Sequence, residues 1–498
     1  MELNFQKNIC SCLDTAVREI QNAEQAQEIK LPDGMPDIGR ILAAWGQPIL
    51  RSKEWRSDCI TFSGGMMAWV LYAPEDDSGE RCIDAWIPFQ MKWDLPSGVP
   101  EGSIRIQCLP RFVDARSVAA RKIMVRAGMA AMAEAFVPKE VETYMPDSMP
   151  KDVELLRSTY PVRLSKEAGE KTFLMDEDLT LPDSAPQPDK LICYRLNPKI
   201  TDKKVLANKV VFRGNANLHT LYRSEEGELH SWDFELPFSQ YAELTGEHGT
   251  DAQADFALSP TSLELELDDE GHLRLKCGMA AQYLITDKHL LELIEDAYSP
   301  NRELSIHTEN LELPAVLENR RENIYGEQTI PAEATLTADV NFLPDFPRQR
   351  RSENGVEMEI PGVFQVLYYG EDGVLHSGTA RWEGTQGISA DENSQITAIP
   401  MPAEAQAAAG NGQILVKADL PLDMTTTARQ SIPMVTGVEL GENRQPDPNR
   451  PTLILRRAGD KRLWDIAKAA GSTMESIRRA NNLQEEPLPD QMLLIPVS

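Results

Sequence analysis

The stretch Leu263-Glu-Leu-Glu-Leu-Asp-Asp-Glu-Gly-His-Leu-Arg-Leu-Lys-Cys277 decides the fold of most of this chain. Apolar residues occupy alternate positions on both sides of an acidic turn that contains Gly271. A period of two is typical of strands with one buried face, and the short turn predicts an antiparallel hairpin. A second hairpin is expected at Asn411-Gly412, because both positions tolerate positive φ. We therefore predict that the body of the chain is mainly β.

This hairpin belongs to a pattern that recurs at a constant spacing. Four pairs of short segments are each separated by 150 residues: Leu31-Pro-Asp33 with Leu181-Pro-Asp183, Phe62-Ser-Gly64 with Phe212-Arg-Gly214, Leu71-Tyr72 with Leu221-Tyr222, and Gly128-Met-Ala-Ala131 with Gly278-Met-Ala-Ala281. A fifth pair, Pro88-Phe89 and Pro237-Phe238, is one residue short of that spacing. Chance matches would scatter in spacing, so the sequence indicates a duplicated domain.

A third, more diverged copy is expected to follow. The segment Phe364–Tyr368 and the turn Gly370–Gly373 resemble the Leu221-Tyr222 strand and its acidic turn. The turn at Asn411-Gly412 and the apolar segment Ile414–Val416 resemble the turn Asp268–Gly271 and the alternating Leu273 and Leu275 that follow it.

Two segments of the first copy are ambiguous between helix and strand. Gly128–Phe136 is rich in Ala and Met, and by propensity alone it favours a helix. Its counterpart in the second copy contains Tyr283-Leu-Ile285, which favours a strand. Homologous copies share a fold, so we predict strands in both. The segment Asp14–Ile29 stays open.

The pattern changes in the last tenth of the chain. A short apolar strand at Thr452–Arg456, two small helices and a closing apolar strand at Leu493–Pro496 fit the order of residues, which is a βααβ module. Ser472-Thr-Met-Glu475 has the spacing of a capping box and predicts the start of the second helix. The apolar face of the first helix is formed by residues at helical spacing, namely Leu463, Ile466, Ala467 and Ala470.

This C-terminal module resembles a LysM domain, a small carbohydrate-binding fold usually found in cell-wall proteins. The resemblance rests on Trp464-Asp-Ile-Ala-Lys468, on Asn481-Asn482 and on the closing Ile495-Pro496. The repeats ahead of it, with their Leu-Pro-Asp, Phe-x-Gly, Leu-Tyr and Pro-Phe segments, resemble the SPOCS-domain family of coat-morphogenesis proteins from endospore-forming bacteria. That resemblance implies a protein of the mother cell whose LysM module binds the morphogenetic ATPase of the spore coat.

The LysM resemblance also implies a binding site. In LysM domains the ligand groove lies between two loops, which here are Gly459–Arg462 and Asn482–Pro489. The candidate partner- or glycan-binding residues are Gly459, Asp460, Lys461, Arg462, Trp464, Lys468, Ile477, Asn481, Asn482 and Gln484. Lys461-Arg462 replaces the usual Thr, so a small hydroxyl is lost and two positive charges are gained, which favours an acidic protein surface over a glycan. Glu485-Glu486 would partly oppose such a partner.

Several of these residues have a structural alternative. Trp464 could stack on a sugar, but its place beside Leu463 favours the edge of the core. Asp460 is expected to cap the first helix rather than to contact a ligand. Lys468 is expected to point outward, where it is either solvated or in contact with a partner.

Composition and charge narrow the class of protein. The chain has 498 residues, of which 41% are hydrophobic, enough for three or four domains. The net charge of −28 argues against nucleic acid and anionic membranes as partners. From Pro451 onward, seven Lys/Arg face six Asp/Glu, so the module carries +1 and the rest −29.

The cysteines and the N-terminus indicate the compartment. The seven cysteines are scattered and odd in number, which is typical of buried thiols in a reducing environment. The N-terminus lacks the pattern of a signal peptide, and no apolar run is long enough for a membrane span. We therefore expect a cytoplasmic protein without membrane insertion.

Catalytic signatures are few. All seven histidines lie between His219 and His376, without a His-x-x-His or Glu-x-x-His pair, and there is no nucleophile elbow or P-loop. Asp76-Asp77 and Glu225-Glu226 could serve acid–base chemistry, but acidic hairpin turns explain them as well. We assign no catalytic residue, metal or cofactor, with a hydrolase of the β domains as an alternative.

The sequence thus predicts tandem β-sandwich-like SPOCS domains followed by an α+β LysM domain. The expected boundaries are 1–150 for the first domain, 151–180 for a connecting segment, 181–300 for the second domain, 330–440 for the third, 441–450 for a linker and 451–498 for LysM. The expected function is non-catalytic coat assembly, in which the module binds the coat ATPase and the β domains recruit other coat proteins. The alternative is a protein that binds the N-acetylglucosamine polymers of cortex or wall.

Overall fold

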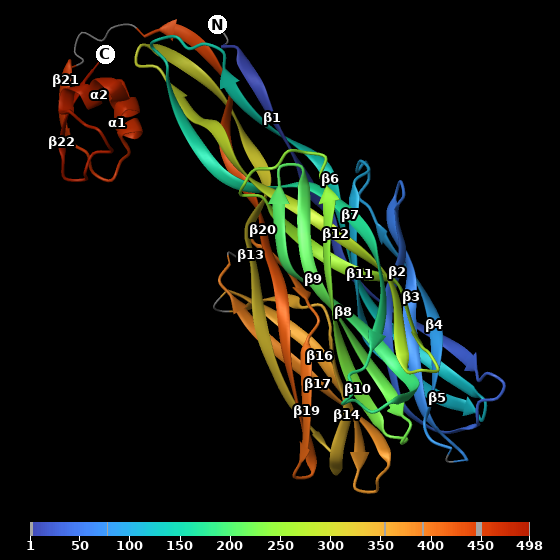
Figure 1. Cartoon of the computed structure of the whole chain (residues 1–498). Coiled ribbons are helices and arrows are strands. Elements are labelled where there is room, and N and C mark those ends of the chain that lie inside the picture. Colours follow the sequence, from blue (N-terminus) through green and yellow to red (C-terminus); the bar gives the residue numbers. More distant parts are fainter. Residues whose placement is uncertain (1–2, 77, 353–354, 391–392, 445–450, 498) are drawn as a thin grey trace.

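The computed structural model describes the whole chain except residues 1–2, 77, 353–354, 391–392, 445–450 and 498 (Figure 1). Most described residues are in strands, and the two helices are short and lie near the C-terminus, so the predicted mainly β multidomain class is confirmed. Neither α1 nor α2, the helices that the structure describes, has the length and apolar character needed to cross a bilayer.

The strands form three groups with the same pairing scheme. The first group is β1 (Phe5–Lys30), β2 (Ile38–Trp55), β3 (Cys59–Pro74), β4 (Arg81–Asp94), β5 (Ser103–Ala119) and β6 (Lys122–Pro146). The second is β7 (Glu154–Thr180), β8 (Pro188–Leu206), β9 (Lys209–Ser224), β10 (Leu229–Glu243), β11 (Gln253–Leu267) and β12 (His272–Tyr298). The third is β13 (Arg302–Pro331), β14 (Ala334–Pro344), β15 (Arg348–Ser352), β16 (Gly355–Gly370), β17 (Leu375–Ile388), β18 (Gln395–Pro400), β19 (Glu404–Gly410) and β20 (Gln413–Asn443). We call these groups units 1, 2 and 3.

In each unit the long first strand pairs with the long last strand, as β1–β6, β7–β12 and β13–β20. The last strand also pairs with the strand before it in the chain, and the middle strands form a separate small sheet, β2-β3-β4 in unit 1 and β8-β9-β10 in unit 2. Apolar side chains of the two sheets interdigitate in one core per unit. Each unit is therefore a small sandwich.

The hairpins predicted from alternation are present. Leu263 pairs with Cys277 across β11 and β12, and both side chains are buried. Asn411 and Gly412 both have positive φ, at 53° and 74°, in the turn between β19 and β20. The ambiguous segments are strands too, since Gly128–Phe136 lies within β6 and Asp14–Ile29 within β1. The strand prediction for Gly128–Phe136 is thus confirmed, and pairing along β1–β6 overrides the helix-favouring composition of both segments.

The recurring Phe-x-Gly and Pro-Phe segments have a common packing role. Gly214 in β9 lies opposite Phe238 in β10, and a Cβ at Gly214 would lie 2.5 Å from the Phe238 ring and 2.2 Å from the Lys199 carbonyl oxygen. Gly64 likewise lies opposite Phe89 in unit 1. Unit 3 lacks Pro-Phe, and Trp382 occupies the position opposite Gly362.

Two expected boundaries are wrong. The connecting segment 151–180 contains β7, which pairs with β12, and β13 already begins at Arg302 rather than near residue 330. Both strands carry many charged residues and several register shifts, which hide their alternation. The linker expected at 441–450 is shortened by β20, which extends to Asn443, and its residues 445–450 lie outside the described part of the chain.

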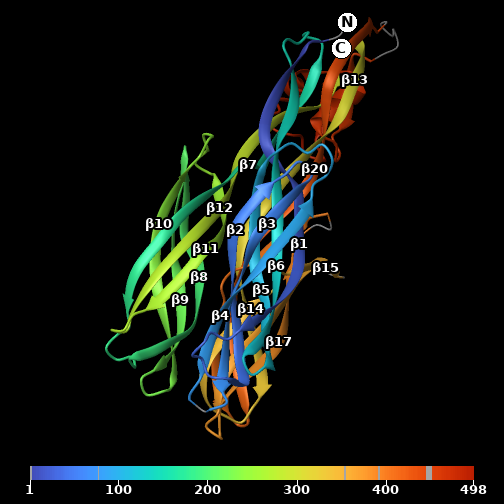
Figure 2. The ribbon, with the colours of Figure 1, turned by 90° about the vertical axis from the view of Figure 1, so that its right-hand side faces the viewer.

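The three units are joined to one another through strand pairing and shared apolar clusters. Leu13 of β1 pairs with Ser165 of β7, which joins the long strands of units 1 and 2 into one six-stranded sheet. Beyond the sandwiches, the outer ends of the long strands of all three units pack together in a narrow stalk (Figures 1 and 2). Its apolar core includes Cys12, Val141, Leu164, Leu293, Leu313 and Ile432.

The C-terminal module has the predicted βααβ order. It consists of β21 (Leu453–Arg457), α1 (Leu463–Ala470), α2 (Met474–Asn481) and β22 (Met492–Pro496), with β21 and β22 antiparallel. Figure 1 shows the module beside the end of the stalk, at the same end of the molecule as the start of β1.

Candidate functional site

The module is held by a small core beneath α1. Three residues of the predicted face, Leu463, Ile466 and Ala467, are buried and pack with Ile477 of α2 and Leu493 of β22, and Ala470 is partly buried. α2 begins as predicted at Met474, but its cap is Thr473 and not Ser472 of the predicted capping box. The hydroxyl of Thr473 accepts a hydrogen bond from the Ser476 amide at 3.1 Å. Ile477, a candidate binding residue, is therefore part of the core.

The cap predicted for the first helix is wrong. Asp460 does not cap α1, whose N-cap position is Arg462 and lacks a side-chain cap. Instead, the carboxylate of Glu486 accepts a hydrogen bond of 2.7 Å from the Leu463 amide. This carboxylate comes from the second loop, close in space but 23 residues away in the chain, so no local spacing rule could find it. The Glu486 carboxylate therefore satisfies one of the backbone amides that have no partner within the helix at its start.

The two predicted loops lie against each other. The amide of Gly459 donates to the carbonyl oxygen of Pro489 at 2.9 Å, and Glu486 adds a second link between the loops. Asp460, Lys461 and Gln484 are exposed. Together with the exposed Arg462, these side chains can meet a large partner at the loops.

The asparagines of the candidate set hold the backbone together. Asn481 bonds both the amide and the carbonyl of Leu494, which ties α2 to β22. Asn482 takes the left-handed conformation with φ of 52° and ends α2. These structural roles account for both asparagines without a bound ligand.

The remaining candidates face the stalk. The indole Nε1 of Trp464 donates to Asp296 at 2.8 Å, and the Lys468 ammonium lies 2.7 and 2.8 Å from the two oxygens of the same carboxylate. Arg462 lies 3.7 Å from Glu295. The Trp464 ring packs edge-on against Tyr298 with 4.7 Å between ring centroids. The candidate residues outside the core and the helix end thus divide between the exposed loops and a contact with β12.

This contact changes the ionisation of its groups. Partial burial would raise the pKa of Asp296, but the hydrogen bonds from Lys468 and Trp464 outweigh burial and lower this pKa below its ordinary value. Burial raises the pKa of Tyr298, whose hydroxyl donates to the Ser472 carbonyl oxygen at 2.9 Å. At neutral pH the Asp296 carboxylate is therefore charged and the Tyr298 hydroxyl is protonated.

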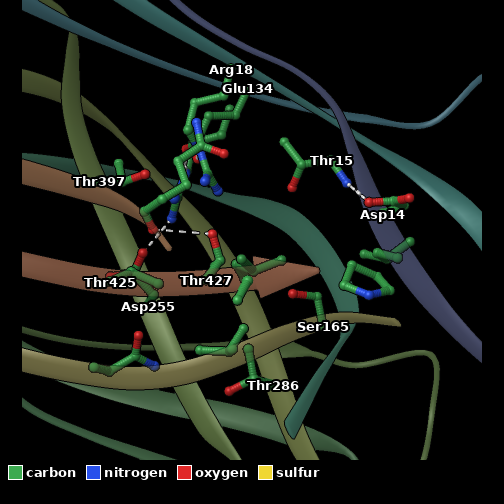
Figure 3. A pocket seen from close by; sticks show the side chains of 18 of the residues that line it. Asp14, Thr15, Arg18, Glu134, Ser165, Asp255, Thr286, Thr397, Thr425 and Thr427 are labelled. Atoms are coloured by element: carbon green, nitrogen blue, oxygen red, sulfur yellow. Dashed lines mark hydrogen bonds and ion pairs between the residues drawn. The ribbon is translucent and has the colours of Figure 1, made fainter. Parts of the chain in front are cut away.

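A second candidate region is a polar cavity of about 430 Å³ where the three units meet. Figure 3 shows the hydroxyls of Thr15, Ser165, Thr286, Thr397, Thr425 and Thr427 around it. Beside them, Glu134 accepts hydrogen bonds from Arg18 at 2.8 Å and from Arg105 at 2.5 Å. Arg105 also donates to Asp255 of unit 2 at 2.6 Å.

The charges of this cavity neutralise one another. Burial would raise the pKa of Glu134, but Arg105 and Arg18 lower it to about 2, so the carboxylate stays ionised at neutral pH. Arg105 and Asp255 are 150 positions apart, so counterpart positions of units 1 and 2 face each other here. A permanently charged, fully paired carboxylate is suited to joining the units and not to donating a proton.

His219 and several of the cysteines are also part of the packed structure. His219 of β9 lies 2.9 Å from Asp233 and 2.9 Å from the buried Asp339 of unit 3. All seven cysteines are free thiols, and Cys193 and Cys277 are buried. Within the described ranges, no group of three or more His, Cys, Asp or Glu residues is placed to hold a metal ion.

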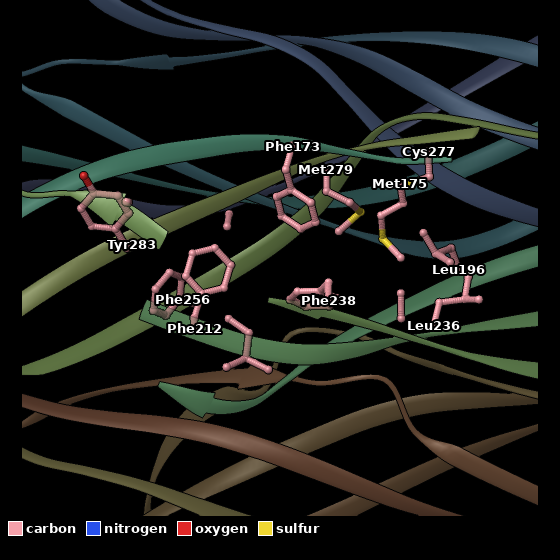
Figure 4. Packing of buried hydrophobic residues seen from close by; sticks show 14 of the residues in the cluster. Phe173, Met175, Leu196, Phe212, Leu236, Phe238, Phe256, Cys277, Met279 and Tyr283 are labelled. Carbon is pink, nitrogen blue, oxygen red and sulfur yellow. The ribbon is translucent and has the colours of Figure 1, made fainter. Parts of the chain in front are cut away.

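One comparison with known proteins gives a match. The protein-family model described as SipL, SPOCS domain, matches residues 188–266. This segment is similar to a SPOCS domain. It spans β8 to β11 of unit 2 and supplies Leu196, Phe212, Leu236, Phe238 and Phe256 to the core in Figure 4. The match supports the SPOCS part of the family resemblance and is consistent with a role related to the spore coat. No curated protein and no solved structure matches the chain.

Proposed function

We propose that this chain is a non-catalytic assembly protein of the spore coat that acts in the mother cell. Its C-terminal module is a LysM-like domain that binds the morphogenetic ATPase of the coat, and its three units carry further coat proteins. The SPOCS match at residues 188–266, in a chain that ends in a βααβ module, is the observation that supports this function best.

The charge of the module supports a protein partner. The module carries Lys461 and Arg462 in its exposed first loop, whereas the rest of the chain is strongly acidic. Such a basic surface suits an acidic protein, because charge complementarity fixes orientation and speeds encounter.

Glycan binding is the competing function, and the geometry disfavours it. A sugar-stacking platform needs an accessible aromatic face, but with the module docked on the stalk Trp464 is only 2% exposed. In the first loop, Lys461-Arg462 replaces the usual Thr and brings positive charge instead of a hydroxyl. The proposal therefore places the coat ATPase ahead of N-acetylglucosamine polymers as the ligand.

The test is a binding assay with the full chain against the purified coat ATPase and against purified peptidoglycan sacculi. We expect binding to the ATPase and none to sacculi. The double variant Lys461→Glu/Arg462→Glu should lose most of this binding, because two attractive charges become repulsive. Arg456→Glu/Arg457→Glu is the matched control, since it makes the same change of charge on β21. Binding to sacculi alone would overturn the proposal.

A further inference from the structure

The end of β12 contacts the side of α1 that carries Trp464 and Lys468. Asp296 and Tyr298 are alternate residues of one strand and both point at the module. The acidic side chain receives the indole and ammonium groups of Trp464 and Lys468, and the phenol donates to the Ser472 carbonyl oxygen. The carboxylate of Asp296 and the phenol of Tyr298 are therefore both paired with groups of the module.

The contact is also well buried. Tyr298 is 6% exposed and Trp464 is 2% exposed, although each belongs to a different part of the chain. Their rings meet edge-on, an arrangement that adds to the free energy of burial. Leu156 of β7 packs against the same cluster. Burial, ring packing and paired charge together distinguish this contact from an incidental touch.

Local backbone geometry directs the strand end toward the module. The pairing of β12 with β7 shifts register between Ile294 and Asp296, which marks a bulge at Glu295. A bulge re-aims the residues that follow it. The counterpart positions of unit 1, 150 residues earlier, are Pro146 and Ser148. Unit 2 therefore has the acidic–aromatic pair and unit 1 does not.

We infer that the α1 face around Trp464 and Lys468 is a binding surface for an extended acidic–aromatic segment, and that Asp296–Tyr298 occupies it within the same chain. A partner that uses this face must present a carboxylate followed two residues later by an aromatic ring, and must displace the stalk. This inference rests on the proposed function and names the chemistry of the partner segment.

Because Asp296 and Tyr298 cover the α1 face in the docked chain, docking should lower the affinity of this face for a partner segment. A chain with a docked module is not competent to bind at this face, and the apparent affinity falls by the fraction of chains that are competent. Opening the contact should therefore raise the affinity of the full chain for any segment that resembles Asp296–Tyr298.

The experiment uses a fluorescent peptide with the sequence of residues 292–300, Glu-Leu-Ile-Glu-Asp-Ala-Tyr-Ser-Pro, and full-length protein. Binding is followed by fluorescence anisotropy. The open variant Asp296→Ala/Tyr298→Ala should bind the peptide at least about tenfold more tightly than the unmodified chain. A peptide with Asp296 and Tyr298 replaced by Ala is the ligand control and should not bind.

Added to the open variant, Lys468→Glu should abolish peptide binding, whereas Arg457→Glu, which reverses a charge elsewhere on the module, should not. The milder variant Asp296→Asn/Tyr298→Phe keeps the volume of both side chains and should give an intermediate gain. Hydrogen exchange of residues 463–472 should be faster in both variants, while that of the sandwich cores stays unchanged.

Equal peptide affinity for the open and unmodified chains, or peptide binding that Lys468→Glu leaves intact, would overturn the inference. Failure of the proposed function looks different. In that case the open variant would bind the peptide but not the coat ATPase.

Discussion

At the scale of single residues, the structure depends on a few buried charges that join the units. Glu134 is fully buried between Arg18 and Arg105, and Arg105 continues the network to Asp255 in the next unit. Buried ions are costly to desolvate, and this cost is offset only while each charge keeps its partners. Removing one member therefore does more damage than the net value of the pair.

The substitution Glu134→Gln should destabilise units 1 and 2 by about 3–5 kcal/mol, because it removes the carboxylate that two guanidinium groups share. Arg18 then loses its counter-charge, and Arg105 keeps only that of Asp255. The measurement is chemical denaturation followed by hydrogen exchange of β1, β5 and β6. Asp114→Asn is the matched control. Its carboxylate is 70% exposed and pairs with Arg126 at 3.3 Å, so the expected cost is below about 1 kcal/mol. Equal effects of the two substitutions would contradict this prediction.

At the scale of elements, regular patterns were predictable and distant partners were not. The hairpin at Leu263–Cys277 and the face of α1 follow from side-chain period, which depends only on local sequence. β7 was missed because its segment Ser165–Lys171 is polar and shows no alternation. Pairing with β12 defines it, and pairing is not local.

The candidate site divides in the same way. The capping-box spacing of Ser472 and Glu475 predicted where α2 starts, but the cap is one residue later, at Thr473, which accepts from the Ser476 amide. The role of Trp464 as a contact with Asp296 could not be predicted, because the two residues are 168 positions apart. An aspartate followed by a tyrosine at the end of a strand is too short a signal to stand out.

The corrected cap of α1 gives the prediction at this scale. Glu486→Ala should destabilise the module by about 0.5–2 kcal/mol, as loss of a helix cap usually does. Asp460→Ala should change stability by less than about 0.5 kcal/mol, as expected for an exposed residue without such a role. The measurement is hydrogen exchange of the α1 amides in the full chain. A larger effect of Asp460→Ala than of Glu486→Ala would show that the loop contact is assigned wrongly.

At the scale of the whole molecule, the units share cores and strands instead of forming a flexible string. Leu42, Trp69, Ile192, Leu221, Leu367 and Leu375 from all three units form one buried cluster. The repeat spacing indicates how many units to expect but carries no information about how they pack.

The junction between units 2 and 3 should respond to pH. Asp339 of β14 is buried and bonds Arg195 at 3.1 Å, and His219 lies 2.9 Å from it on the other side. Burial and Arg195 would lower the pKa of His219, but Asp233 and Asp339 outweigh them and raise it above its ordinary value of 6.5. The protonated imidazole therefore stabilises the junction fully below pH 6.5, and this contribution is lost as pH rises through the folded pKa. Arg195 still pairs with Asp339 at high pH, so the junction should loosen and not separate.

The measurement is the difference in thermal unfolding temperature between the unmodified chain and His219→Gln from pH 5.5 to 9. This difference should be largest at the acidic end and should shrink as the imidazole loses its proton, because Gln carries no charge at any pH. His230→Gln is the control. That histidine lies 3.8 Å from an exposed glutamate, so its substitution should leave the pH profile unchanged. A difference that grows toward pH 9 would mean that neutral His219 is the form that holds units 2 and 3 together.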